Sequence, residues 1–156
     1  MKFRILLLVL TLIATSCIDV EVCDESYESE LVVTFKSLKN GVAEDSTLAA
    51  FTLYGIREGK TDSLLYDADA LAGFVVPLDP NKEFSSYVML INEQTDTLVV
   101  SYDHESYMIS YSCGFANIFT LKDVETVSGI ITGDSILNVM VDAEYEEDEE
   151  HIWLYL

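Results

Sequence analysis

Apolar residues recur at every second position through most of this sequence, and this spacing restricts its fold more than any other feature. Leu31, Val33 and Phe35 are an example. In a β-strand, residues two apart share a face, so the spacing predicts strands with one buried side. No segment has a sustained helical period, so we expect an all-β protein. The predicted strands cover residues 31–36, 51–54, 87–91, 98–102, 107–111, 118–121, 137–141 and 152–156.

Turn-forming residues separate these runs, as at Lys39-Asn40-Gly41 and at residues 77–81 and 92–96. Many short strands joined by such turns are typical of an antiparallel β-sandwich of the immunoglobulin-like or Greek-key type, with a small β-barrel as the alternative. The sequence ends within its last predicted strand. We therefore expect that removing residues 153–156 damages the core.

The first 17 residues predict export and lipidation. Lys2 and Arg4 precede an apolar run over residues 5–14 that is too short to cross a bilayer core of about 30 Å. Small residues at 14–16 then lead to Cys17, the residue that would be lipidated after cleavage. We predict a signal peptide over residues 1–16, an acidic tether over 17–29 and one domain over 30–156. Ordinary secretory cleavage after residue 16 is the alternative.

The cysteine count supports lipidation. An exported chain with three cysteines leaves one unpaired, and lipidation of Cys17 accounts for it. Cys23 and Cys113 are then expected to form a disulfide that closes a loop of about 90 residues and stabilises the fold by roughly 4 to 5 kcal/mol on the chain-entropy model. A catalytic thiol or a metal ligand is the competing interpretation, but neither cysteine has a neighbouring histidine or basic residue.

The charge of the chain excludes some partners. Its 28 acidic and eight basic residues give a formal charge of −20, and loss of the signal peptide with two basic residues would leave six against 28, or −22. Nucleic acid and anionic lipid surfaces repel such a protein, so no nucleic-acid partner is expected. The acidic surface is typical of a soluble exported domain, although it would also attract cations.

Two acidic segments could hold a metal ion. Asp103-His104-Glu105 follows a predicted strand, where we expect a polar turn, because neighbours in a strand point to opposite faces and would not converge. Residues 144–150 contain six carboxylates before His151, but lack the spacing and the glycine of a calcium loop. We expect a solvated loop that guards the last strand, and we predict no metal and no cofactor.

Tyrosines offer the best sequence argument for sugar binding. The chain has nine, and Tyr87, Tyr102, Tyr107 and Tyr111 lie in one stretch, where exposed rings could stack on a glycan. Cross-strand packing is the alternative role. No hydrolase, zinc-protease, phosphate-loop or dinucleotide motif occurs, and a serine triad would need one of only two histidines. We therefore expect no enzyme.

The arrangement of Cys17, Cys23, the sequence Tyr111-Ser112-Cys113-Gly114-Phe115 and the ending His151-Ile152-Trp153-Leu154-Tyr155-Leu156 resembles a family of small lipoproteins of Bacteroidota known only as a domain of unknown function. The resemblance implies a β-rich envelope domain with one disulfide, and it implies no ligand or catalytic residue. We thus expect an outer-membrane lipoprotein, periplasmic or surface-exposed, with an interaction or structural role. Its partners would be the membrane, through the lipid, and an envelope protein or glycan. An extracellular glycan-binding accessory protein is the alternative.

Overall fold

The computed structural model describes residues 27–56, 63–68, 70–127, 129–143 and 149–156. Within these ranges the secondary structure consists of strands, and no helix is long and apolar enough to cross a membrane. The strands are β1 (Glu30–Lys39), β2 (Val42–Asp45), β3 (Phe51–Ile56), β4 (Ser63–Ala68), β5 (Gly73–Pro77), β6 (Phe84–Ile91), β7 (Gln94–Ser110), β8 (Gly114–Thr126), β9 (Gly133–Ile136), β10 (Met140–Val141) and β11 (Ile152–Tyr155).

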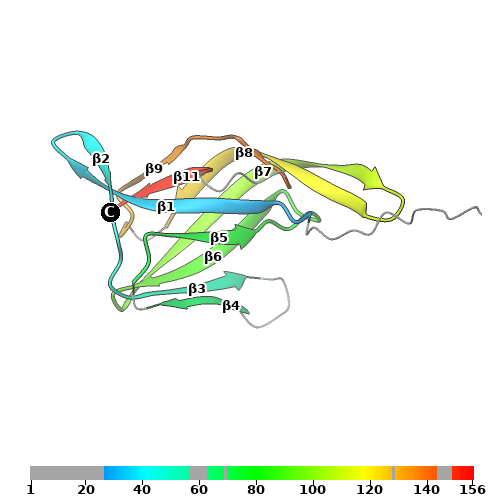
Figure 1. Ribbon diagram of the computed structural model, residues 1–156. Coiled ribbons are helices and arrows are strands. Elements are labelled where there is room, and N and C mark those ends of the chain that lie inside the picture. The colour runs from blue at the N-terminus through cyan, green and yellow to red at the C-terminus, as the bar shows by residue number, and fades with distance from the viewer. Residues whose placement is uncertain (1–26, 57–62, 69, 128, 144–148) are drawn as a thin grey trace, which may run out of the picture.

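The strands form two packed sheets, so the predicted all-β sandwich is confirmed (Figure 1). The five-stranded sheet has the order β2-β1-β11-β9, with β5 also paired to β1. The six-stranded sheet has the order β10-β8-β7-β6-β3-β4. Neither strand order closes on itself in the part of the chain described, which favours the sandwich over the small barrel.

One strand pair departs from the predicted antiparallel arrangement. β1 and β11 run parallel, with Val33 opposite Ile152 and Phe35 opposite Leu154. The other pairs are antiparallel, so the five-stranded sheet is mixed. Alternation of apolar residues along a strand predicts which face is buried, but not whether the neighbouring strand runs parallel or antiparallel. The parallel pairing of β1 with β11 therefore could not be predicted from this pattern.

The core lies between the sheets and follows the period of two. Leu31, Val33 and Phe35 of β1 are fully buried, as the alternation predicted. Phe35 packs edge-on against Phe51 of the opposite sheet, with ring centroids 5.4 Å apart, and Phe74 of β5 stacks on Phe51 at the same distance. Burial of each such side chain contributes about 1.5–3 kcal/mol, and these contacts hold the sheets face to face.

Two of the predicted turns have the backbone that tight hairpins need. Asn40 and Gly41 have φ values of 55° and 80°, and Asn92 and Glu93 have values of 48° and 67°. Two consecutive residues with positive φ are the mark of a type I′ turn, whose twist matches that of the flanking strands. These turns fix the β1–β2 and β6–β7 hairpins.

The strand predictions were wrong in some details. The predicted strands over residues 98–102 and 107–111 fall on the single 17-residue strand β7, which ends at Ser110, so Tyr111 lies in the turn after it. The expected strand over residues 137–141 is instead the end of a loop and the two-residue β10, with Leu137 and Val139 exposed. The pattern also missed β2, β4, β5 and β9, which are short or lie at sheet edges.

Candidate functional site

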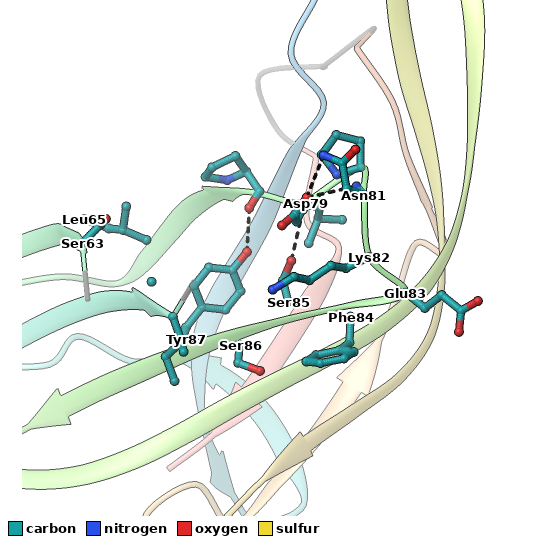
Figure 2. A pocket seen from close by; sticks show the side chains of 15 residues that line it. Ser63, Leu65, Asp79, Asn81, Lys82, Glu83, Phe84, Ser85, Ser86 and Tyr87 are labelled. Atoms are coloured by element: carbon teal, nitrogen blue, oxygen red, sulfur yellow. Dashed lines mark hydrogen bonds between the residues drawn. The ribbon is translucent and has the colours of Figure 1, made fainter. Parts of the chain in front are cut away.

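An open groove of about 770 Å³ lies at the end of the six-stranded sheet (Figure 2). One wall is formed by the end of β3 and the start of β4, and the other by the loop after β5 and the start of β6. Its rim carries the exposed apolar side chains of Ile56, Leu65 and Phe84. Lys82 and Glu83 add one charge of each sign.

Two buried tyrosines hold the loop that forms the groove. The Tyr102 hydroxyl lies 2.7 Å from the Ser85 hydroxyl, donates to the Asp79 carbonyl and accepts from the Asp79 N–H, both at 3.0 Å. The Tyr87 hydroxyl donates to the Pro77 carbonyl at 2.6 Å. Burial raises the pKa of Tyr102 despite these hydrogen bonds. The network uses neutral groups and gives the groove a fixed wall.

Two polar residues that line the groove take part in hydrogen bonds that shape its wall. Asp79 accepts hydrogen bonds at Oδ1 from the N–H and the side-chain amide of Asn81, an Asx turn that shapes the loop. Ser85 is engaged by Tyr102, and no histidine is among the lining residues to act as a base. A surface with apolar rim residues, mixed charges and a rigid wall is suited to binding.

His151 is a buried imidazole among the described residues. Its exposed fraction is 2%, and its Nδ1 accepts a hydrogen bond of 3.1 Å from the Val32 N–H. Among the described residues Nε2 has no hydrogen-bond partner of normal geometry, although Glu149 Oε1 lies 3.7 Å away. Burial lowers the pKa of His151, opposed in part by Glu149, the Met140 carbonyl and Asp142. The ring is therefore neutral and links β1 to the segment before β11.

We expect His151 to make the fold sensitive to mild acid. Its pKa in the folded protein lies below the ordinary value of about 6.5, so the unfolded chain takes up the proton first and stability falls as the pH drops below that value. Protonation would also break the bond from the Val32 N–H. Thermal unfolding between pH 7 and pH 5 should show a falling melting temperature.

The variant His151→Asn provides the control, because its side-chain oxygen can accept from the Val32 N–H without titrating. Its melting temperature should depend less on pH than that of the wild type in this range, which lies above the pKa of ordinary carboxylates. Equal slopes for the two proteins would show that His151 does not control the response.

The predicted acidic loop is described only at its end. Residues 144–148 lie outside the described part of the chain, so their metal binding is untested. Glu150 lies 3.2 Å from Lys36 Nζ and accepts from the Trp153 indole at 2.6 Å. Burial alone would raise the pKa of Glu150, but bonds from Trp153, Thr34 and Lys36 lower it. Glu150 thus stabilises the last strand.

Lys36 is a buried cation at the centre of this cluster. Its ammonium lies 2.6 Å from Asp45 and 4.5 Å from the centre of the Trp153 ring. Burial alone would lower its pKa, but Asp45 and Glu150 raise it. The cluster joins β2, β1 and β11 on the outer face of the five-stranded sheet, and no group of three or more metal-ligating side chains occurs within the described ranges.

The sequence Asp103-His104-Glu105 is not a turn as predicted but part of β7. Asp103 pairs with Thr120 and His104 with Phe119, so neighbouring side chains lie on opposite faces of the ribbon. This agrees with the expectation that they do not converge on one metal ion. Asp103 forms an exposed ion pair with Lys122 on β8. Residues 103–106 are exposed on both faces of the β7–β8 ribbon, although they remain paired with β8. The strand therefore continues here without an alternation of apolar residues.

The four tyrosines do not form one exposed platform. Tyr87 and Tyr102 are buried, Tyr107 is half-buried and Tyr111 is fully exposed. Packing within and beside the core is confirmed for Tyr87 and Tyr102. Only Tyr111 retains the full exposure that stacking on a sugar would require.

Sequence analysis missed Asp96, a buried carboxylate at the start of β7. Its Oδ1 accepts from the N–H groups of Thr97 at 2.7 Å and Val127 at 3.1 Å, and its Oδ2 from Ile131 at 3.3 Å. These bonds fasten the loop after β8 to the sheet. A signal was present, because Asp96 shares the period of two with Leu98 and therefore the inward face.

The cysteine predictions fall mainly outside the described residues. Cys17 and Cys23 belong to residues 1–26, so lipidation and the Cys23–Cys113 pairing stay predictions. Cys113 lies in the turn between β7 and β8, where its N–H donates to the Ser110 hydroxyl at 3.0 Å.

Comparison with known proteins gives one match. A model described as a family of unknown function, DUF6452, matches residues 50–156, which include β3 to β11. This confirms the expected likeness to a family without a known activity. No curated protein and no solved structure matches the chain.

Proposed function

This chain belongs to the family of unknown function DUF6452, and from that premise we propose that it is a lipid-anchored, non-catalytic interaction domain of the outer cell envelope. One observation carries the non-catalytic role. Two buried polar side chains hold parts of the fold together, since His151 accepts through Nδ1 from the Val32 N–H of β1 and Asp96 holds the loop after β8. A buried group used in this way is not available to a substrate.

The groove is the surface that we propose for an envelope protein partner. Ile56 and Phe84 on its rim are 42% and 49% exposed, and apolar side chains of this size are typical anchors in protein interfaces. The wall behind them is fixed by the hydrogen bonds of Tyr87 and Tyr102. A preformed wall reduces the entropy lost when a partner binds.

The anchor would be a lipid on Cys17, with Cys23 paired to Cys113. The Ser29 hydroxyl donates to the Asn117 carbonyl, so the chain before β1 runs beside β8. Cys113 lies four residues before Asn117 and Cys23 six before Ser29, so the two cysteines are within reach of each other.

One experiment tests both the lipid anchor and the binding of a partner at the groove. A photo-crosslinking amino acid replaces Phe84, and cells are illuminated, fractionated and blotted. We expect the protein and a protein adduct in the membrane pellet. In the same protein with Cys17→Ala, the chain should move to the soluble fraction and the adduct should be lost, because the anchor holds the domain beside its partner.

Leu38 provides the matched control position, since it is 57% exposed on the β1–β2 hairpin and does not line the groove. The crosslinker there should give no such adduct. Membrane retention of the Cys17→Ala protein would refute the lipid anchor, and equal adducts from both positions would refute the groove. Large-protease treatment of intact cells, with lysed cells as control, would then separate a surface from a periplasmic location.

A further inference from the structure

The long hairpin of β7 and β8 extends beyond the rest of the six-stranded sheet (Figure 1). The pairing of β7 with β6 ends at Ser101, opposite Phe84. From Tyr102 onward β7 pairs only with β8, as far as Ser110 opposite Gly114. We call the part formed by residues 103–118 the arm and residues 108–115 its tip. A two-stranded ribbon is marginally stable in water by itself, so the tip needs support from another surface.

The tip is apolar and uncharged in a strongly acidic protein. Residues 106–121 form the longest run in the sequence without an acidic, basic or histidine residue. Tyr111 is 100% exposed and Phe115 is 70% exposed. Met108, also exposed, lies directly opposite Phe115 in the ladder, so these two side chains share one face. Exposed apolar groups gathered in this way mark an interaction site.

The path of the chain brings the N-terminal segment to the arm. The Ser29 hydroxyl donates to the Asn117 carbonyl, and Asn117 lies opposite Ser106. From Ser106 the strand reaches Tyr111 in five residues, or about 17 Å at the rise of a β-strand. Twelve residues separate Cys17 from Ser29, and a chain of that length spans at most about 40 Å. A lipid on Cys17 can therefore lie beside the tip.

We infer that the tip, through Tyr111, Phe115 and Met108, inserts into the interfacial region of the membrane that holds the lipid anchor. The inference rests on the lipid anchor of the proposed function. Tyrosine and other aromatic side chains favour the level of the lipid headgroups, where the ring is shielded and the hydroxyl stays hydrated. The remaining acidic surface is repelled by anionic headgroups, so the tip is the part of the domain that such a membrane accepts.

The orientation adds a second contact to a single lipid. A second membrane contact adds its own binding free energy to that of the lipid. Insertion of the tip would also fix the orientation of the domain relative to the membrane. The groove lies near the root of the arm, because Phe84 on its rim pairs with Ser101, and it would be held at about the length of the arm above the headgroups.

The test places a fluorescent reporter at the tip of the full lipidated protein by Tyr111→Trp. The protein is reconstituted in vesicles of phosphatidylethanolamine and phosphatidylglycerol, with or without phosphatidylcholine brominated on the acyl chains. We expect a blue-shifted emission and loss of most of the added signal with brominated lipid. Trp153, the single native tryptophan, provides a constant background that is subtracted with the wild-type protein.

Leu38→Trp is the control, because Leu38 is exposed on a different hairpin. Its added signal should not be quenched. A Tyr111→Trp protein that sediments with vesicles but is not quenched would overturn the inference and leave the anchor intact. Failure of the wild type to sediment would refute the anchor itself. An emission change caused by polysaccharide without vesicles, and no quenching, would assign the tip to a glycan instead.

Discussion

Removal of residues 152–156 is expected to abolish the cooperative unfolding of the domain. β11 lies between β1 and β9, and its loss would leave both strands without a neighbour on that side. Ile152 and Leu154 have no exposed surface, so their removal also opens the core between the sheets. Thermal unfolding followed by circular dichroism should show no sharp transition for the truncated protein.

A graded variant separates loss of the strand from loss of core volume. Leu154→Ala keeps the backbone ladder of β11 and should destabilise the domain by about 2–5 kcal/mol, as large-to-small core substitutions do. It should still unfold cooperatively. A truncated protein with the melting temperature of the wild type would contradict the role assigned to β11.

Asp96→Ala is expected to be the most damaging single substitution of a polar residue. It would leave the buried N–H of Ile131 and that of Thr97 without their acceptor, while Val127 keeps a bond to the Thr97 carbonyl. An unsatisfied buried donor costs about 1–3 kcal/mol, so the loss should be about 3 kcal/mol or more. Urea unfolding measures this as a lower midpoint.

Asp103→Ala is the matched control on the same strand, because Asp103 is exposed and pairs only with Lys122 among the ion pairs found. A surface ion pair contributes little, and this variant should stay within about 1 kcal/mol of the wild type. Asp96→Asn should be intermediate, since its amide keeps one oxygen acceptor but turns a donor towards a second N–H. Equal midpoints for Asp96→Ala and Asp103→Ala would refute the argument.

The sequence predicted the architecture where one face of a strand is buried and failed where neither face is. β1 and the first half of β7 alternate clearly because their alternate residues enter the core. In the arm, residues 103–106 are exposed on both faces, and the pattern ends although the hydrogen-bonded ladder continues. The single strand β7 was therefore predicted as two.

The site was less predictable because its residues act through distant partners. His151 is one of two histidines in the sequence, but its bond to the Val32 N–H follows from the parallel pairing of β1 and β11. The groove is formed by three segments that are separate in the sequence, so no local motif predicts it. Asp96 was detectable in principle, as an acidic residue on the inward face of an otherwise apolar series with Leu98 and Val100.

The parallel pairing of β1 with β11 also bears on the order in which the chain can fold. Val32 and His151, which hydrogen-bond across this junction, are 119 positions apart. A chain that emerges from its N-terminus thus presents one open edge of β1 until residues 152–155 have been delivered. Such long-range pairing is slow to form, and an open edge invites pairing with other chains. Completion of the sheet therefore waits for the synthesis of residues 152–155, and a holding factor that covers β1 during that interval would improve the yield of folded protein.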